Sequence, residues 1–223
     1  MNGVDDANEN VIEVPRILPR GRHSLGDDVV KQSQRVRMLE AMTACCAANG
    51  YASVSVADVL KESGVSRKTF YEHFVNKEDC LIAAYDSGLE KVNERIAATV
   101  ASATQGGENL LRATQSEYLD ALADNPEFAR LFAVEMLAGG PAARARRDEG
   151  FELFVSLYRA LIAQDPNIET DPSEDQIVAA IGGVAELIRR TVSLRGPEAL
   201  ASIKESAANI TWTLLSGLQR APE

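Results

Sequence analysis

The chain has 223 residues, of which 45% are hydrophobic and 25% charged, and its formal net charge is −10. This composition is typical of a soluble globular protein of one or two domains. Three cysteines without metal-ligand spacing argue against a disulfide framework or a zinc site. The longest run without Asp, Glu, Lys or Arg has seventeen residues, 41–57, fewer than the roughly 18–20 that a membrane span needs. Residues 1–30 have no apolar core of a secretory signal, so we expect a cytoplasmic protein with no membrane partner.

The charge is unevenly distributed along the chain. Residues 16–77 hold ten Lys or Arg and six Asp or Glu, a net charge of +4. Residues 78–223 hold thirteen basic and twenty-three acidic residues, a net charge of −10. An acidic body should repel a polyanion, whereas the front segment can attract one.

The first part of the chain separates into an arm and a helix. Residues 1–30 are rich in Asn, Asp, Pro and Gly and show no hydrophobic periodicity, which indicates a disordered arm. From about Val30 apolar residues recur at three- and four-residue steps, which predicts a first helix. Asn49-Gly50 is a favourable C-terminal stop for it.

Two short helices and a long one should follow. Ser55 stands three residues before Asp58, the spacing of a capping box at a helix start. Gly64 should end that helix, and Ser66 can cap the next one. Asn76 should cap a long fourth helix, whose first turn is acidic, as the helix dipole favours.

The rest of the chain indicates further helices and no strand. Proline and glycine breaks separate apolar-periodic segments, and none of these alternates as a strand would. The predicted fold class is all-α, with about nine helices. The last five predicted helices are residues 107–124, 127–138, 142–164, 173–195 and 198–219.

Residues 55–77 have the organisation of a helix-turn-helix, in which a short helix, a tight turn and a second short helix share a small core. Phe70 and Phe74 lie four residues apart and point to one side, so Lys68 and Glu72 fall on the opposite face. An exposed polar helix with a plain core is the other interpretation of this pattern.

As a DNA-binding unit, the segment offers two kinds of contact. Arg67 and Lys68 stand at the end of the helix that enters the major groove, where they can donate to guanine O6 and N7. Polar side chains around them are of types that bind phosphate oxygens. The candidate DNA-binding residues are Ser55, Ser66, Arg67, Lys68, Thr69, Tyr71, His73 and Lys77.

The N-terminal arm contains a further, weaker candidate for a DNA contact. PRGRH, residues 19–23, is similar to the Arg-Gly-Arg segments that some proteins place in an A·T-rich minor groove. Arg20 and Arg22 are therefore candidate DNA contacts, and a solvated tail with two incidental arginines is the alternative.

The stretch VSVADVLKESGVSRKTFYEHFVNKEDCLIAAY, residues 54–85, resembles the DNA-binding signature of the tetracycline-repressor (TetR) family. The resemblance covers residues 31–85 by motif and the chain from 86 to 219 only by length and helix count. The chain departs at Val59-Leu60, where the family often has Ile-Ala. It also departs at Arg67-Lys68, where many members have a small residue, so the base preference stays open. The matching positions are Ser55, Asp58, Gly64, Val65, Ser66, Thr69, Phe70, Tyr71, His73, Phe74, Lys77 and Leu81.

This resemblance implies a homodimeric bacterial repressor that binds a palindromic operator on double-stranded DNA. It implies a helix-turn-helix DNA-binding domain, residues 31–77 here, and a helical effector-binding and dimerisation domain, residues 78–223. A small-molecule effector would change the spacing of the two DNA-binding heads and release the operator.

The middle helices hold most of the phenylalanines. Phe128, Phe132 and Phe154, with Glu135 or Tyr158 as a polar anchor, are the candidate walls of an apolar ligand pocket. A packed bundle core is the alternative.

The last two helices are the expected dimer face. Gly182-Gly183 interrupt an apolar run, at a cost of about 1 kcal/mol each inside a helix, which makes sense where backbones approach closely. An intrachain core is again the alternative. The apolar stripes assigned to this face are Ile181, Val184, Leu187 and Ile188, then Trp212, Leu215 and Leu218. The arginines at 144, 146 and 147 are interpreted as a solvated face or loop, and those at 189 and 190 as partners of nearby acids.

An enzyme is not expected. The chain has two histidines, His23 and His73, and shows no phosphate loop, dinucleotide fingerprint or metal-ligand spacing. We therefore expect no catalytic residue, no cofactor and no metal. Two alternatives to a repressor stay open, namely an activator of the same fold and a helical protein-interaction module without specific DNA binding.

Overall fold

The structure is a computed structural model that describes residues 27–104, 106–163 and 172–216. Every regular element within these ranges is helical, with nine α-helices and two short 3₁₀ helices. The all-α prediction is confirmed for this part of the chain. None of these helices is both long and apolar enough to cross a membrane. The predictions for Arg20, Arg22 and Leu218 concern positions outside the described residues.

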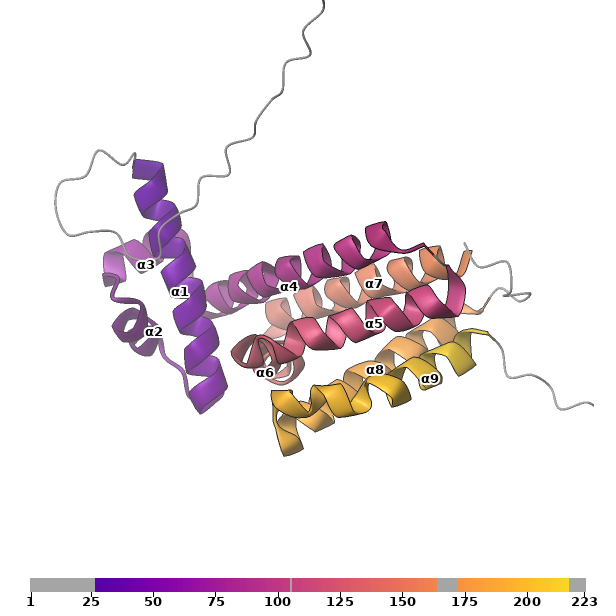
Figure 1. Cartoon of the computed structure of the whole chain (residues 1–223). Coiled ribbons are helices and arrows are strands. Elements are labelled where there is room, and N and C mark those ends of the chain that lie inside the picture. Colours follow the sequence, from indigo (N-terminus) through magenta and orange to yellow (C-terminus); the bar gives the residue numbers. More distant parts are fainter. Residues whose placement is uncertain (1–26, 105, 164–171, 217–223) are drawn as a thin grey trace, which may run out of the picture.

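Three helices form a head at one end of the molecule (Figure 1). They are α1 (Asp27–Asn49), α2 (Val56–Ser63) and α3 (Arg67–His73). Helix α1 begins three residues before the expected start at about Val30. The long helix α4 (Lys77–Ser102) leads from the head into a body of helices that run side by side (Figure 1).

The body contains the remaining elements, and two of them differ from expectation. The predicted helix 127–138 is interrupted at Val134, whose φ of −121° and ψ of −55° leave the α-helical geometry. The predicted helix 198–219 starts instead as a 3₁₀ helix at Pro197, which lacks a side-chain cap. The elements are α5 (Gly107–Ala123), α6 (Pro126–Ala133), η1 (Glu135–Ala138), α7 (Pro141–Ala163), α8 (Glu174–Arg195), η2 (Pro197–Ile203) and α9 (Lys204–Leu215).

Local hydrogen bonds explain where the helices of the head begin. Ser55 Oγ accepts from the Asp58 amide at 3.3 Å, and the Asp58 carboxylate accepts from the Ser55 amide at 2.8 Å. Ser66 Oγ and Asn76 Oδ1 accept from the amides three residues further on, at 3.1 and 2.9 Å. Gly64 ends α2 with a φ of 66°, which favours glycine. The predicted caps and stop are confirmed.

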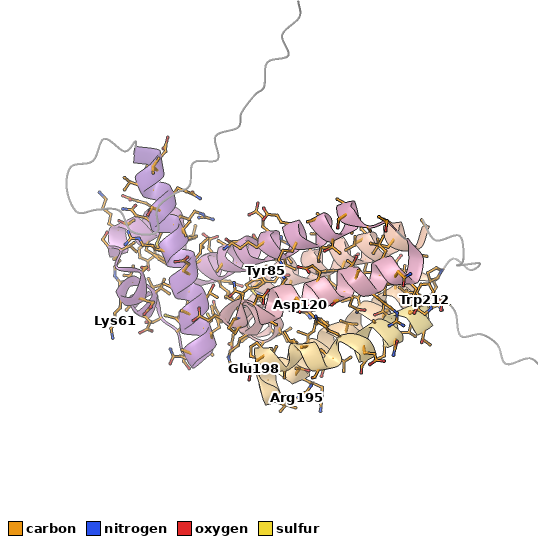
Figure 2. The ribbon with its side chains drawn as sticks, viewed as in Figure 1. Lys61, Tyr85, Asp120, Arg195, Glu198 and Trp212 are labelled. Atoms are coloured by element: carbon orange, nitrogen blue, oxygen red, sulfur yellow. The ribbon has the colours of Figure 1, made fainter. Side chains whose placement is uncertain are left out.

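One cluster of buried side chains extends from the head into the body. It joins Met42 and Phe70 of the head to Leu81 of α4 and Leu131 of α6. Helix α1 packs against α4 and α6, so the head rests directly on the body. Tyr85 lies inside the body along α4, whereas Trp212 lies at the end far from the head, near a second, smaller cluster (Figure 2).

Candidate nucleic-acid interface and ligand cavity

Helix α3 has one buried face and one open face. Phe70 and Phe74 are fully buried, and the Arg35 guanidinium lies 4.8 Å from the centroid of the Phe74 ring. This arrangement fixes the orientation of α3 against α1. The two-faced helix expected from the four-residue spacing of the phenylalanines is confirmed.

The open face presents a compact set of polar groups. Arg67, Lys68 and Tyr71 are exposed, and Tyr71 packs edge-on to the Phe70 ring at 5.4 Å between centroids. The Lys68 ammonium lies 3.8 Å from Glu72, but both side chains are largely in water, where such a pair contributes little. The cationic groups of Arg67 and Lys68 are thus available to an external partner.

The other candidate DNA-binding residues differ in how exposed their polar groups are. Ser55 and Ser66 serve as caps with exposed hydroxyl groups, and the half-buried Thr69 hydroxyl lies 2.9 Å from Ser66 Oγ. His73 is half-buried at the end of α3. Burial, with the nearby charge of Arg35, lowers its pKa below the usual value, so it is a neutral hydrogen-bonding group near pH 7.

Lys77 has a role that the sequence did not reveal. Its ammonium donates to the carbonyl oxygens of Tyr51 at 2.9 Å and Val54 at 2.7 Å, and it lies 4.0 Å from the Tyr51 ring centroid. Two of its three donors are therefore used inside the protein. Lys77 anchors the turn that joins α1 to α2, which we call the junction turn, residues 50–54.

The junction turn is also held from the body. The buried carboxylate of Glu135, on η1, accepts a hydrogen bond from the Tyr51 amide at 2.7 Å. Arg130 Nε lies 3.4 Å from the other carboxylate oxygen but makes no hydrogen bond to it within the described residues. The expectation that Glu135 is a polar anchor in a ligand pocket is therefore wrong, because its carboxylate is committed to the head.

A cavity of about 210 Å³ lies in the body between α4, α5, α6, α7 and α8. The Tyr85 and Phe132 rings stack with 5.6 Å between centroids, and Tyr118 and Phe154 pack at 5.2 Å. Burial raises the pKa of Tyr85 and of Tyr158 to about 12, so their phenols stay neutral. Six aromatic residues line the cavity, namely Tyr85, Tyr118, Phe132, Phe151, Phe154 and Tyr158.

Three of the five predicted pocket residues lie at this cavity, namely Phe132, Phe154 and Tyr158. Phe128 does not, because its ring packs against the backbone of α4 at Gly88. Tyr85 and Tyr118 also line the cavity, from two other helices, and were not among the predicted pocket residues. Helical spacing places both on inward faces, but no local signal indicates that those faces meet.

The charged groups that line the cavity are Arg147, Glu186 and Arg189. Arg189 donates two hydrogen bonds of 2.7 Å to Glu186, which confirms its predicted pairing. Arg146 lies 2.7 Å from Asp86, whereas Arg147 lines the cavity. The interpretation of Arg146 and Arg147 as a solvated face is wrong, because both are largely covered by neighbouring helices.

The exposed apolar residues of α8 and α9 differ from the predicted stripes. Leu194 is 72% exposed, and Val178 and Ile210 are also exposed. A Cβ atom added at Gly182 or Gly183 would meet no atom within 4 Å, so the backbone there is open to the surroundings. Four residues of the predicted stripes belong instead to the core of the chain, namely Ile181, Val184, Ile188 and Leu215.

No group of three or more His, Cys, Asp or Glu side chains in the described ranges is arranged to hold a metal ion. Cys46 and Cys80 are buried, which raises the pKa of each thiol to about 12. Such thiols are not nucleophiles near neutral pH.

Comparison with known proteins agrees with this geometry. Residues 38–84 match the sequence model of a family described as bacterial regulatory proteins, tetR family. The HTH-type transcriptional regulator EthR of Mycolicibacterium smegmatis is 30% identical over 132 residues, which cover 52% of this chain. The chain spans 58% of the length of that relative.

Solved structures share the fold over most of the chain. The fatty acid degradation regulator FadR from Bacillus halodurans has a TM-score of 0.72 at 19% identity, covering 84% of this chain and 97% of its own. FadR from Bacillus subtilis, in complex with stearoyl-CoA, has a TM-score of 0.70 at 19% identity, covering 81% and 98%. SCO4454 from Streptomyces coelicolor, a TetR-family regulator, has a TM-score of 0.63 at 22% identity, covering 82% and 90%.

At these identities the solved structures show the fold alone. The matched segment, residues 38–84, runs through the helix-turn-helix head into α4. In this segment the chain is similar to the tetR family of bacterial regulatory proteins.

Proposed function

We propose that the chain is a homodimeric transcriptional repressor that binds a palindromic operator and is released by a small, largely apolar ligand. Residues 31–77 would form the DNA-binding domain and residues 78–223 the effector-binding and dimerisation domain. The protein would act in the cytoplasm, where bacterial DNA is accessible. The observation that carries the proposal is the open face of α3, which presents Arg67, Lys68 and Tyr71 while Phe70 and Phe74 hold its other face in the core.

DNA binding follows from the chemistry of this face. The guanidinium of Arg67 and the ammonium of Lys68 suit guanine O6 and N7 in the major groove. Tyr71 and the neutral His73 can donate to phosphate oxygens on either side. The body is acidic, so the net attraction for DNA is concentrated at the head.

A dimer is proposed through α8 and α9. Val178, Leu194 and Ile210 are exposed apolar side chains on these two helices, and Gly182 and Gly183 permit close approach of a second backbone. A twofold axis at these helices would set two heads side by side, as a palindrome requires.

Release by a ligand is proposed through the aromatic cavity. Its walls include Phe132 of α6 and Tyr85 of α4, and α4 leads directly to the head. The B. subtilis relative holds stearoyl-CoA, which supports a ligand-binding role for this fold. Repression is favoured over activation because binding and release of DNA suffice for it, whereas activation needs a further contact surface.

The proposal is tested by selecting bound sequences from a pool of random duplexes with the full chain. We expect enrichment of an inverted repeat whose half-site centres are about 34–36 Å apart, or a multiple of it. Sedimentation of the complex should give an even number of chains per site. A pool without enrichment after repeated selection would contradict sequence-specific binding, and a single chain per site would contradict the dimer.

The arm provides a second prediction. If Arg20 and Arg22 contact the minor groove or phosphates, deletion of residues 1–24 should weaken operator binding. The slope of log affinity against log salt should fall by up to about 2, since each phosphate contact contributes about 0.9. Fluorescence anisotropy at several salt concentrations measures both quantities. An unchanged slope would remove the arm from the interface.

A further inference from the structure

One charged side chain at the cavity has no partner that satisfies it. Arg147, on α7, lines the cavity and its side chain is only 32% exposed. The nearest acid is its neighbour Asp148, at 3.7 Å, whose own side chain is 76% exposed. Arg147 makes no hydrogen bond to any residue of the described ranges, although a guanidinium has five N–H donors.

The arginines around it are all engaged. Arg146 lies 2.7 Å from Asp86, and Arg144 donates to the carbonyl oxygen of Gly139 at 2.7 Å. Arg189, the second arginine at the cavity, is balanced by Glu186 through two hydrogen bonds. The described lining of the cavity therefore carries one positive charge in excess, and it belongs to Arg147.

That charge acts on the interior of the cavity. Arg147 lies close enough to Tyr85 and Tyr118 to oppose the rise in the pKa of both phenols that burial causes. The only acid within 4 Å of Arg147 in the described ranges, Asp148, lies 3.7 Å away and accepts no hydrogen bond from it, so the guanidinium donors are unused, and a planar carboxylate matches their fork. Apart from the Arg189–Glu186 pair, the rest of the wall is aromatic and aliphatic and has room for an apolar body.

We propose that Arg147 selects the ligand of the cavity, which is a carboxylate on an apolar body that packs among Tyr118, Phe132 and Phe154. One excess positive charge matches the single charge of a carboxylate better than the nearly double charge of a phosphate monoester. This inference rests on the ligand-binding part of the proposed function, and it names the class of ligand.

Two probes of equal shape test the inference. 2-Naphthylacetate carries the carboxylate, and 2-naphthylacetamide replaces it with a neutral amide on the same ring system. Isothermal titration calorimetry of the full chain at pH 7 should show the acid binding about 10- to 100-fold more tightly, the range expected for a charge-assisted hydrogen-bonded pair. 2-Naphthyl phosphate should bind less tightly than the acid.

Variants locate the effect. Arg147→Met keeps an apolar stem and should lower the affinity for the acid to that for the amide, with the amide unchanged. Arg147→Lys keeps the charge without the fork and should fall between. Arg159→Met removes an exposed arginine of the same helix away from the cavity and should change neither affinity. Ala185→Phe, which fills the cavity, should abolish binding of both probes.

Equal binding of acid and amide would overturn the proposal, as would full binding of the acid by Arg147→Met. Binding of neither probe at millimolar concentration would overturn it as well. Circular dichroism melts establish that each variant is folded. The same preparations are titrated with the selected DNA duplex, so a chain that binds DNA but not the acid refutes the ligand class and leaves the DNA-binding proposal intact.

Discussion

Gly88→Ala should lower the free energy of unfolding by about 1–3 kcal/mol, although alanine is the better helix former. Gly88 lies in α4 where the Phe128 ring of α6 rests on the helix backbone. A Cβ atom at Gly88 would lie 2.0 Å from Phe128 Cε2 and 2.2 Å from Cδ2. The Phe128 ring is 3% exposed and has little room to move, so α6 must shift. Urea denaturation measures the loss.

The same substitution made in a Phe128→Leu variant separates the effect of this clash on stability from other effects. Phe128→Leu removes the ring edge that the new methyl group would meet, at its own cost of a smaller side chain in the core. In that background the further change Gly88→Ala should cost close to nothing or stabilise the protein. An equal cost of Gly88→Ala in both backgrounds would contradict the close approach of α4 and α6.

Glu135→Ala should destabilise the protein by about 1–3 kcal/mol, because the Tyr51 amide would lose its acceptor while buried. The loss should be local at first. Amide exchange at Tyr51 and Val54 in the junction turn should accelerate more than exchange in the middle of α5. Hydrogen exchange and urea denaturation of the full chain measure the two effects.

Glu135→Gln is the matched control. Glutamine keeps a carbonyl oxygen that can accept from the Tyr51 amide, so most of the stability and the slow exchange should be retained. Lys77→Met tests the other attachment of the turn, since it removes the donors to the carbonyl oxygens of Tyr51 and Val54. If Glu135→Gln behaves like Glu135→Ala, the hydrogen bond does not hold the head.

Features that depend on residues close together in the chain could be predicted from the sequence. The caps at Ser55, Ser66 and Asn76 depend on atoms three residues apart, so local spacing predicts them correctly. The inward face of α3 depends on Phe70 and Phe74, one helical turn apart, and is equally local. Local patterns thus predict the head and the open face of α3.

The interior of the body depends on which helices meet. Helical periodicity indicated that Phe128 and Phe132 are buried, but not that one packs on Gly88 and the other stacks on Tyr85. Glu135 was assigned to the pocket because it stands among aromatic residues in the sequence. Its partner, the Tyr51 amide, lies 84 residues away, and no local pattern reveals such a pair.

The surroundings of charged residues were equally hard to predict from local sequence. Arg144, Arg146 and Arg147 form a short basic run that resembles a solvated surface. In the fold, helical spacing separates them, so that Arg146 meets Asp86 on α4 and Arg147 turns to the cavity. The candidate ligand site could be predicted as an aromatic pocket, but its charged group depends on the arrangement of α4, α7 and α8.

The central claim is that the open face of α3 reads DNA, and fluorescence anisotropy of the full chain on labelled DNA from upstream of its own gene tests it most directly. Arg67→Ala/Lys68→Ala should weaken binding at least about 30-fold, since each base contact contributes about 1–3 kcal/mol. Lys91→Ala/Arg159→Ala, which removes two exposed charges from the body, should leave it nearly unchanged. Tight binding that survives random competitor duplex and is lost only in the first variant is the predicted result. Equal weakening by both variants, or wild-type binding that random duplex removes, would contradict it.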